Sequence, residues 1–194
     1  YAATVACSLA YLLLKQQDSV GCIAFDELVR ARTSIRSTRA HLSTIAAALQ
    51  ANEPAGKTDP GAILRELAET QPRRGMIILI SDLFGDTDSI LRGLRLLRQK
   101  DHDVIVLHVL DDDELDFPFD NPTRFEGLEL PEQLTCNPRA LREGYLRSMK
   151  AFLQKVKRGC ARDAVEYNLL RTSEPLDAAL AAVLSKRTAA ARAH

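Results

Sequence analysis

Apolar side chains along this chain follow two different spacings, and the alternation between them predicts its architecture. Where apolar residues recur every three or four positions, they predict one buried face of a helix. This spacing predicts helices over residues 1–14, 41–50, 60–70, 89–100, 139–158 and 175–187. Short runs of consecutive or alternating apolar residues predict strands instead. Such runs lie at 20–25, 28–36, 76–81, 103–110 and 165–172.

The order of these segments predicts an α/β fold. The runs MIILIS (76–81) and DVIVLHVL (103–110) are apolar without alternation, which is typical of strands buried on both faces. We therefore expect a doubly wound, mostly parallel sheet with helices on both faces, in which 76–81 is a central strand. The run at 28–36 alternates and carries charge, so it is predicted to be an antiparallel edge strand.

One domain over residues 1–187 accounts for nearly the whole length of 194 residues. Residues 111–137 interrupt the pattern. Much of this segment is rich in Pro, Asn and Gly, so it is predicted to be an inserted loop or flap, with a short hairpin around RFEGLEL. Residues 188–194 are predicted to form a frayed tail.

Polar residues follow both buried strands, at the sheet edge where parallel sheets bind ligands. Asp82 comes directly after the first of these strands, and an acidic run beginning at Asp111 follows the second. Thr58 lies just before the helix start that Asp59 and the next proline predict. Carboxylate and hydroxyl oxygens suit Mg²⁺ or Mn²⁺. The alternative is that Asp82 or Asp86 caps the following helix and that Thr58 only turns the chain.

The sequence Gly-Lys-Thr that contains Thr58 also raises the possibility of a phosphate-binding loop. That motif, Gly-x-x-x-x-Gly-Lys-Ser/Thr, needs a further glycine five residues before the Gly of Gly-Lys-Thr. The loop must also follow a buried strand. Ala51 stands where the first glycine is required, and residues 41–50 predict an amphipathic helix. Nucleotide binding is therefore not expected.

Composition narrows the possible partners. Lys plus Arg equals Asp plus Glu, at 26 each, so no net charge favours nucleic acid. The four cysteines are scattered without metal-ligand spacing, which indicates reduced thiols. The apolar N-terminal segment is too short to span a membrane and lacks the basic start of a signal peptide. We expect a cytoplasmic protein with no nucleic-acid partner and no membrane span.

The acidic residues Asp111, Asp112, Asp113 and Glu114 allow two interpretations. They can form a surface for a partner or extend a metal site, or they can be a solvated loop. His108 lies within an apolar run, so it is predicted to be a hydrogen-bonded core residue and not a general base. No motif for a catalytic nucleophile is present.

Four segments, DSVGCIAFDELV, AGKTDPGAILREL, MIILISDLFGD and TSEPLDAALAAVLSKR, resemble a von Willebrand factor A-type domain. Together with FPFDNPTRFEGLEL and AFLQKVKRGCARDAVEYNLLRT, they are similar to the short branch of the bacterial domain-of-unknown-function family fifty-eight, over essentially the whole chain. Genes of this family typically lie beside those of MoxR-type AAA+ ATPases.

The resemblance implies a metal-ion-dependent adhesion site, in which Thr58 and Asp82 match two metal ligands. Asp59, Ser81 and Asp86 are expected to support them. The Asp-x-Ser-x-Ser loop that supplies the other ligands in this family is absent from the chain. In the family it lies just before the first helix, where this sequence begins. Either the given sequence starts late or this protein has lost the motif; we expect that the chain lacks the first strand and holds only part of the site.

These features predict a non-enzymatic interaction module in which Mg²⁺ or Mn²⁺ bridges to a MoxR-type AAA+ ATPase or to its client protein. An enzyme remains an alternative, as a Mg²⁺-dependent phosphotransfer or receiver-like domain that uses a strand-end aspartate. The third possibility is a purely structural role, in which the acids cap helices and provide solubilising charge.

Overall fold

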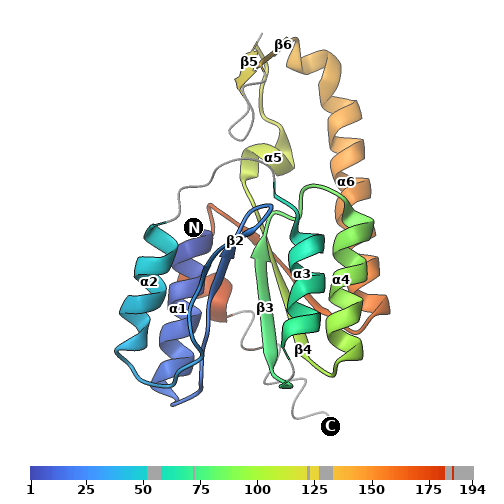
Figure 1. Ribbon diagram of the computed structural model, residues 1–194. Coiled ribbons are helices and arrows are strands. Elements are labelled where there is room, and N and C mark those ends of the chain that lie inside the picture. Colours follow the sequence, from blue (N-terminus) through green and yellow to red (C-terminus); the bar gives the residue numbers. More distant parts are fainter. Residues whose placement is uncertain (52–57, 72, 122, 127–132, 182–184, 186–194) are drawn as a thin grey trace.

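The computed structural model describes residues 1–51, 58–71, 73–121, 123–126, 133–181 and 185 (Figure 1). Its helices are α1 (Ala2–Lys15), α2 (His41–Gln50), α3 (Pro60–Thr70), α4 (Thr87–Gln99), α5 (Asp112–Asp116) and α6 (Pro138–Arg162). Its strands are β1 (Ile23–Phe25), β2 (Val29–Arg32), β3 (Met76–Ser81), β4 (Asp103–Leu110), β5 (Thr123–Glu126), β6 (Gln133–Cys136) and β7 (Glu166–Arg171). Residues 176–181 are helical as well.

The main sheet has three parallel strands in the order β3-β4-β7. Ile78 of β3 pairs with Ile105 of β4, which pairs in turn with Glu166 of β7. The middle strand is therefore β4, and the prediction that 76–81 is central is wrong for the described strands. The burial pattern agrees, because five consecutive residues of β4 are buried whereas Met76 is 46% exposed. Both strands are short, mainly apolar runs, so composition could not show which of them lies in the middle.

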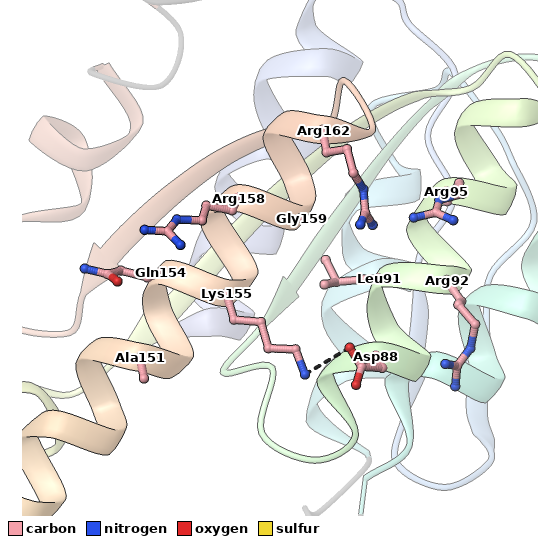
Figure 2. A pocket seen from close by; sticks show the side chains of 10 residues that line it. All are labelled: Asp88, Leu91, Arg92, Arg95, Ala151, Gln154, Lys155, Arg158, Gly159 and Arg162. Atoms are coloured by element: carbon pink, nitrogen blue, oxygen red, sulfur yellow. Dashed lines mark ion pairs between the residues drawn. The ribbon is translucent and has the colours of Figure 1, made fainter.

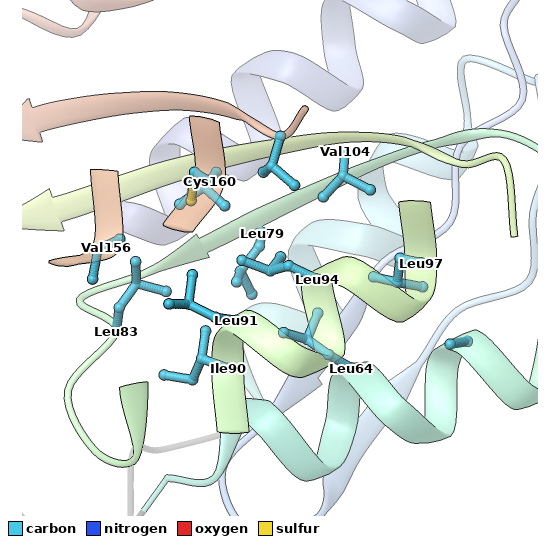
Figure 3. Packing of buried hydrophobic residues seen from close by; sticks show 13 residues of the cluster. Leu64, Leu79, Leu83, Ile90, Leu91, Leu94, Leu97, Val104, Val156 and Cys160 are labelled. Atoms are coloured by element: carbon cyan, nitrogen blue, oxygen red, sulfur yellow. The ribbon is translucent and has the colours of Figure 1, made fainter. Parts of the chain in front are cut away.

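Helices cover both faces of this sheet, and successive residues of β4 show it. Val104 and Val106 point into a cluster built mainly from α3, α4 and α6 (Figure 3). Ile105 and Leu107 point into a second cluster with α1 and the helical segment at 176–181. Because side chains alternate along a strand, one strand supplies both cores. The predicted α/β fold with a parallel sheet and helices on both faces is confirmed.

Two antiparallel hairpins accompany the sheet. β1 and β2 form a two-stranded sheet of their own, in which Ala24 pairs with Ala31, so β2 is not an edge strand of the parallel sheet. β5 and β6 form the second hairpin, within the predicted flap; its connection, residues 127–132, lies outside the described residues. The tail at 188–194 lies outside them too. α6 extends four residues beyond its predicted end at 158, to Arg162.

Within the part of the chain that the structure describes, no helix is both long and apolar enough to cross a lipid bilayer. Cys7, Cys22 and Cys160 are free thiols, as predicted. Burial raises the pKa of Cys160 to about 11, so this thiol stays protonated at neutral pH. It behaves as part of the core next to Val156.

Candidate functional site

A short loop after β3 presents the predicted aspartates, and its own hydrogen bonds fix its shape. Ser81 Oγ accepts a hydrogen bond from Leu83 N at 3.0 Å, and Asp82 Oδ1 accepts one from Phe84 N at 3.1 Å. Leu83 has a φ of 58°, which is uncommon for a bulky residue. Its side chain is fully buried in the core, and this packing holds the backbone in place. Asp82 is exposed at the mouth of the loop.

Asp86 ends this loop as the N-cap of α4. Its Oδ1 accepts hydrogen bonds from Asp88 N at 3.0 Å and Ser89 N at 3.1 Å. Asp59 plays the same role for α3, through Ala62 N at 3.0 Å. The capping interpretation therefore holds for Asp86 and Asp59. Asp82 instead closes a local turn with one oxygen.

Thr58 lies beside this loop, as the sequence predicted. A Cβ atom added at Gly85 would lie 3.8 Å from the Thr58 carbonyl oxygen. Asp59 N donates a 3.3 Å hydrogen bond to the carbonyl oxygen of Asp26, the residue that follows β1. Three loops, following β1, preceding α3 and following β3, thus meet near Asp82. The Gly56 and Lys57 of the Gly-Lys-Thr sequence lie outside the described residues, but a helix, α2, precedes them as predicted.

Asp26 is a functional candidate that the sequence did not single out. Its side chain is 12% exposed, pairs with Arg30 Nε at 2.6 Å and accepts a hydrogen bond from Leu28 N at 3.0 Å. These bonds, chiefly the one from Arg30, lower the pKa of Asp26. Asp26 therefore stabilises the hairpin turn on which Asp59 rests. Only the tertiary contact with Asp59 identifies Asp26 as a candidate, because acidic residues are common in the turns of any protein.

His108 lies beneath the Asp82 loop and ties it to the sheet. Its side chain is fully buried, with Nε2 at 2.6 Å from the Asp82 carbonyl oxygen and Nδ1 at 2.8 Å from the Tyr167 hydroxyl. Because the carbonyl only accepts, Nε2 carries the proton and Nδ1 accepts from Tyr167. Burial lowers the pKa of His108, while the bond to Asp82 opposes this effect. The predicted hydrogen-bonded core histidine is confirmed.

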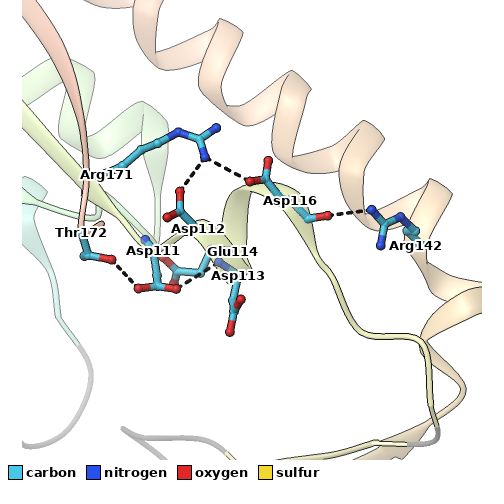
Figure 4. A network of polar contacts seen from close by, with 8 residues as sticks. All are labelled: Asp111, Asp112, Asp113, Glu114, Asp116, Arg142, Arg171 and Thr172. Atoms are coloured by element: carbon cyan, nitrogen blue, oxygen red, sulfur yellow. Dashed lines mark hydrogen bonds and ion pairs between the residues drawn. The ribbon is translucent and has the colours of Figure 1, made fainter. Parts of the chain in front are cut away.

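The acidic run after β4 forms helix α5 and is not a loop (Figure 4). Asp111 is its N-cap, bonding Asp113 N at 3.0 Å, and Glu114 completes a capping box by accepting from Asp111 N at 2.8 Å. Arg171 Nη1 pairs with Asp112 at 2.5 Å and with Asp116 at 3.0 Å. Hydrogen bonds within the acidic run therefore stabilise α5, and its ion pairs with Arg171 connect α5 to β7.

Charges within this cluster reach the Asp82 loop. Burial raises the pKa of Glu114, and the nearby charges of Asp82 and Asp111 raise it further, against the bond from Asp111 N. By contrast, the Thr172 hydroxyl lowers the pKa of Asp111. Several carboxylates thus gather at the carboxyl ends of β3 and β4. Among the residues described, however, no three His, Cys, Asp or Glu side chains lie close enough together to form a metal centre.

The donor set available for a metal is consequently partial. The Asp82 carboxylate has one oxygen outside its turn, and the Thr58 side chain is half-buried nearby. An octahedral Mg²⁺ ion often keeps several waters and takes only one or two carboxylates from a protein. A carboxylate and a hydroxyl are donors of the kind that such an ion takes, so Asp82 and Thr58 stay the predicted ligands.

Comparison with known proteins places the chain in a family. The family described as protein of unknown function DUF58 matches residues 1–154. The chain belongs to this family. A solved structure, the conserved hypothetical protein BatB from Bacteroides thetaiotaomicron, is similar with a TM-score of 0.51 and 16% identity, over 95% of this chain and 87% of that one. At this identity the likeness concerns the fold alone. Among curated proteins, none matches the chain.

In this DUF58 member the structure also reveals a basic surface that sequence reasoning missed. Five Lys and Arg side chains of α4 and α6 line one open groove: Arg92, Arg95, Lys155, Arg158 and Arg162. Overall charge neutrality concealed them. A signal was present, because residues 138–162 contain eight Lys and Arg but a single Glu.

Proposed function

We propose that this DUF58 chain is a non-enzymatic protein-interaction module, which binds its partner at the carboxyl ends of β3 and β4 with the help of Mg²⁺ or Mn²⁺. The observation that carries this proposal is the convergence of the Thr58 and Asp82 loops. They meet next to Gly85 and rest on Asp26. Ligand sites in parallel sheets lie at this edge.

The residues of the proposed site have different roles: some offer oxygen ligands and others fix the loop that carries them. Asp82 offers one carboxylate oxygen outward, while Phe84 N and the His108 ring fix the loop that carries it. Thr58 offers a hydroxyl from the neighbouring loop. A bound Mg²⁺ or Mn²⁺ ion with an open coordination position supplies an acceptor for a carboxylate of the partner. The protein thus provides a preformed but incomplete shell that a partner completes.

The partner that this proposal names is a MoxR-type AAA+ ATPase or the client protein that it remodels, in the cytoplasm. Support comes from the sequence resemblance, which implies genes that lie beside those of such ATPases, and from the exposure of Asp82, which a protein surface can reach. No nucleophile motif in the sequence points to enzymatic chemistry.

Calorimetric titration of the natural full-length protein with Mg²⁺ and Mn²⁺ tests the metal site. Asp82→Asn keeps the oxygen that accepts from Phe84 N but removes the charge, so the turn survives while the ligand weakens. We expect metal affinity to fall by about tenfold or more. Asp101→Asn is the control, because it also removes one exposed carboxylate but lies just before β4, at the opposite end of the sheet.

Equal metal affinity in the wild type and the Asp82→Asn variant would contradict the assignment of Asp82 as a ligand, and no binding by the wild type would eliminate the metal bridge. Retention of a purified MoxR-type ATPase on immobilised protein tests the partner. The amount of retained ATPase should drop with EDTA and with Asp82→Asn but not with Asp101→Asn. If EDTA and Asp82→Asn both leave the amount of retained ATPase unchanged, the strand-end site does not bind the ATPase.

A further inference from the structure

The groove between α4 and α6 lies on the side of the sheet that α3, α4 and α6 cover, and it has a volume of about 630 Å³ (Figure 2). Its floor is apolar where the two helices meet. A Cβ atom added at Gly159 would lie 2.5 Å from both terminal carbons of Leu91. The missing side chain at Gly159 lets α6 approach Leu91, and the longer basic side chains on either side form the walls.

The cations of the groove follow the helical repeat. Lys155, Arg158 and Arg162 are spaced by three and four residues along α6, so they share one face. Arg92 and Arg95 stand three residues apart on α4, opposite them. Figure 2 shows Arg95 and Arg162 on the two walls, with Leu91 between the helices. The positive charge is thus spread over several helical turns.

Carboxylates neutralise only part of this charge. Lys155 Nζ pairs with Asp88 at 2.9 Å, and Asp163 bridges Arg95 and Arg162 with distances of 3.1 Å to each. Asp86 lies 3.6 Å from Arg92. Five cations therefore face three carboxylates, which leaves two positive charges in excess. In the described part of the chain, Arg158 makes no ion pair, and its side chain is exposed.

The distribution of these cations distinguishes between possible anions. A single phosphate carries at most about two negative charges at one point, whereas the cations of the groove are spread over several helical turns on both walls. A peptide with several carboxylates can contact cations on both walls at once. Nucleic acid fits less well, because none of the lining residues is aromatic and single-stranded bases have no surface on which to stack.

We propose that the groove between α4 and α6 binds an acidic peptide segment of a partner protein, with Asp and Glu side chains against Arg92, Arg158 and their neighbours. This surface is separate from the strand-end site and needs no metal. Complementary charge provides specificity and fast association, and it makes the interaction sensitive to salt.

Fluorescence anisotropy with a short labelled peptide of Glu and Asp, in buffer that contains EDTA, tests the groove. Arg158→Glu reverses an exposed charge without breaking an ion pair among the described residues, and Lys157→Glu is the matched control on the adjacent, outward position of the same helix. We expect Arg158→Glu to weaken binding by about tenfold and Lys157→Glu by much less. The Gln and Asn version of the peptide should not bind.

Three outcomes would overturn the proposal: no saturable binding by the folded wild type, equal effects of Arg158→Glu and Lys157→Glu, or tighter binding of a single-stranded oligonucleotide than of the peptide. Circular dichroism verifies that both variants fold. Peptide binding that persists in Asp82→Asn confirms that the groove is independent of the strand-end site, whereas loss of binding in that variant would contradict it.

Discussion

At the scale of single residues, His108 connects the candidate site to the core. One ring nitrogen faces the carbonyl of Asp82 and the other the hydroxyl of Tyr167, and Phe152 packs edge-on against the ring at 5.5 Å. Phe152 also stacks on Phe84, within the same loop, at 5.5 Å. The loop that carries Asp82 is therefore held from below by polar and aromatic contacts together.

Replacing His108 with Leu removes both hydrogen bonds but preserves the apolar bulk. It leaves the Asp82 carbonyl and the Tyr167 hydroxyl without this partner, so we expect a loss of roughly 2–4 kcal/mol in the free energy of unfolding at pH 8. Tyr167→Phe removes only one of the two bonds and should cost about 1 kcal/mol. Urea denaturation measures both, and equal costs for the two variants would contradict the assigned role of the Asp82 contact.

The same substitution reports on pH. The pKa of His108 is lowered in the folded state. Below about pH 6.5, His108 is therefore protonated in the unfolded chain but still neutral in the folded protein. The free energy of unfolding of the wild type therefore falls as the pH drops from 7 through the folded pKa. The His108→Leu variant does not lose stability in this way. The difference between the two proteins should shrink with falling pH.

At the scale of elements, the contact between α3 and α4 depends on glycine. A Cβ atom added at Gly61 would lie 2.8 Å from the carbonyl carbon of Ser89, which is backbone and cannot rotate away. Gly93 makes a similar close approach from α4, to Leu64. These glycines bring α3 and α4 together and so set the spacing of the two helices whose caps, Asp59 and Asp86, border the site.

Gly61→Ala should lower the free energy of unfolding by about 1–3 kcal/mol, because the steric conflict outweighs the gain in helix propensity. Gly144→Ala is the control. It lies within α6 with nothing within 4 Å of an added Cβ, and it should raise stability by up to about 1 kcal/mol. Thermal unfolding followed by circular dichroism compares them, and a neutral or stabilising Gly61→Ala would contradict the close packing.

At the scale of the whole molecule, charge is unevenly distributed although it sums to zero. Carboxylates gather at the strand ends around α5, whereas α6 carries eight Lys and Arg against one Glu. The acidic end attracts positively charged partners, and the basic side attracts negatively charged ones. Both surfaces are built on the same sheet, whose middle strand supplies side chains to both cores.

That shared strand predicts a single cooperative unit. Leu94 lies in the core on the α3, α4 and α6 side, and Leu107 in the core on the α1 side; both are at most 1% exposed. Leu94→Ala and Leu107→Ala should each cost about 2–5 kcal/mol and leave one unfolding transition. Transitions that separate by circular dichroism and tyrosine fluorescence in either variant would show that the two cores unfold independently.

The sequence by itself determined the elements and much of the site. Unalternating apolar runs predicted β3 and β4, and Asp59 with the proline after it predicted the start of α3, because these signals depend on local physics. The strand-end rule predicted that Thr58 and Asp82 would be neighbours, and Thr58 does lie beside the Asp82 loop. Their role as metal ligands stays a prediction.

The tertiary structure alone decided how these elements pair and which charges meet. It made β4 the middle strand, separated β1 and β2 into their own sheet, and turned the acidic run into a helix that Arg171 binds. It also brought Arg95 and Arg162 together across a groove. Pairing order and charge clustering depend on contacts between residues far apart in sequence, and composition and spacing carry no record of those contacts.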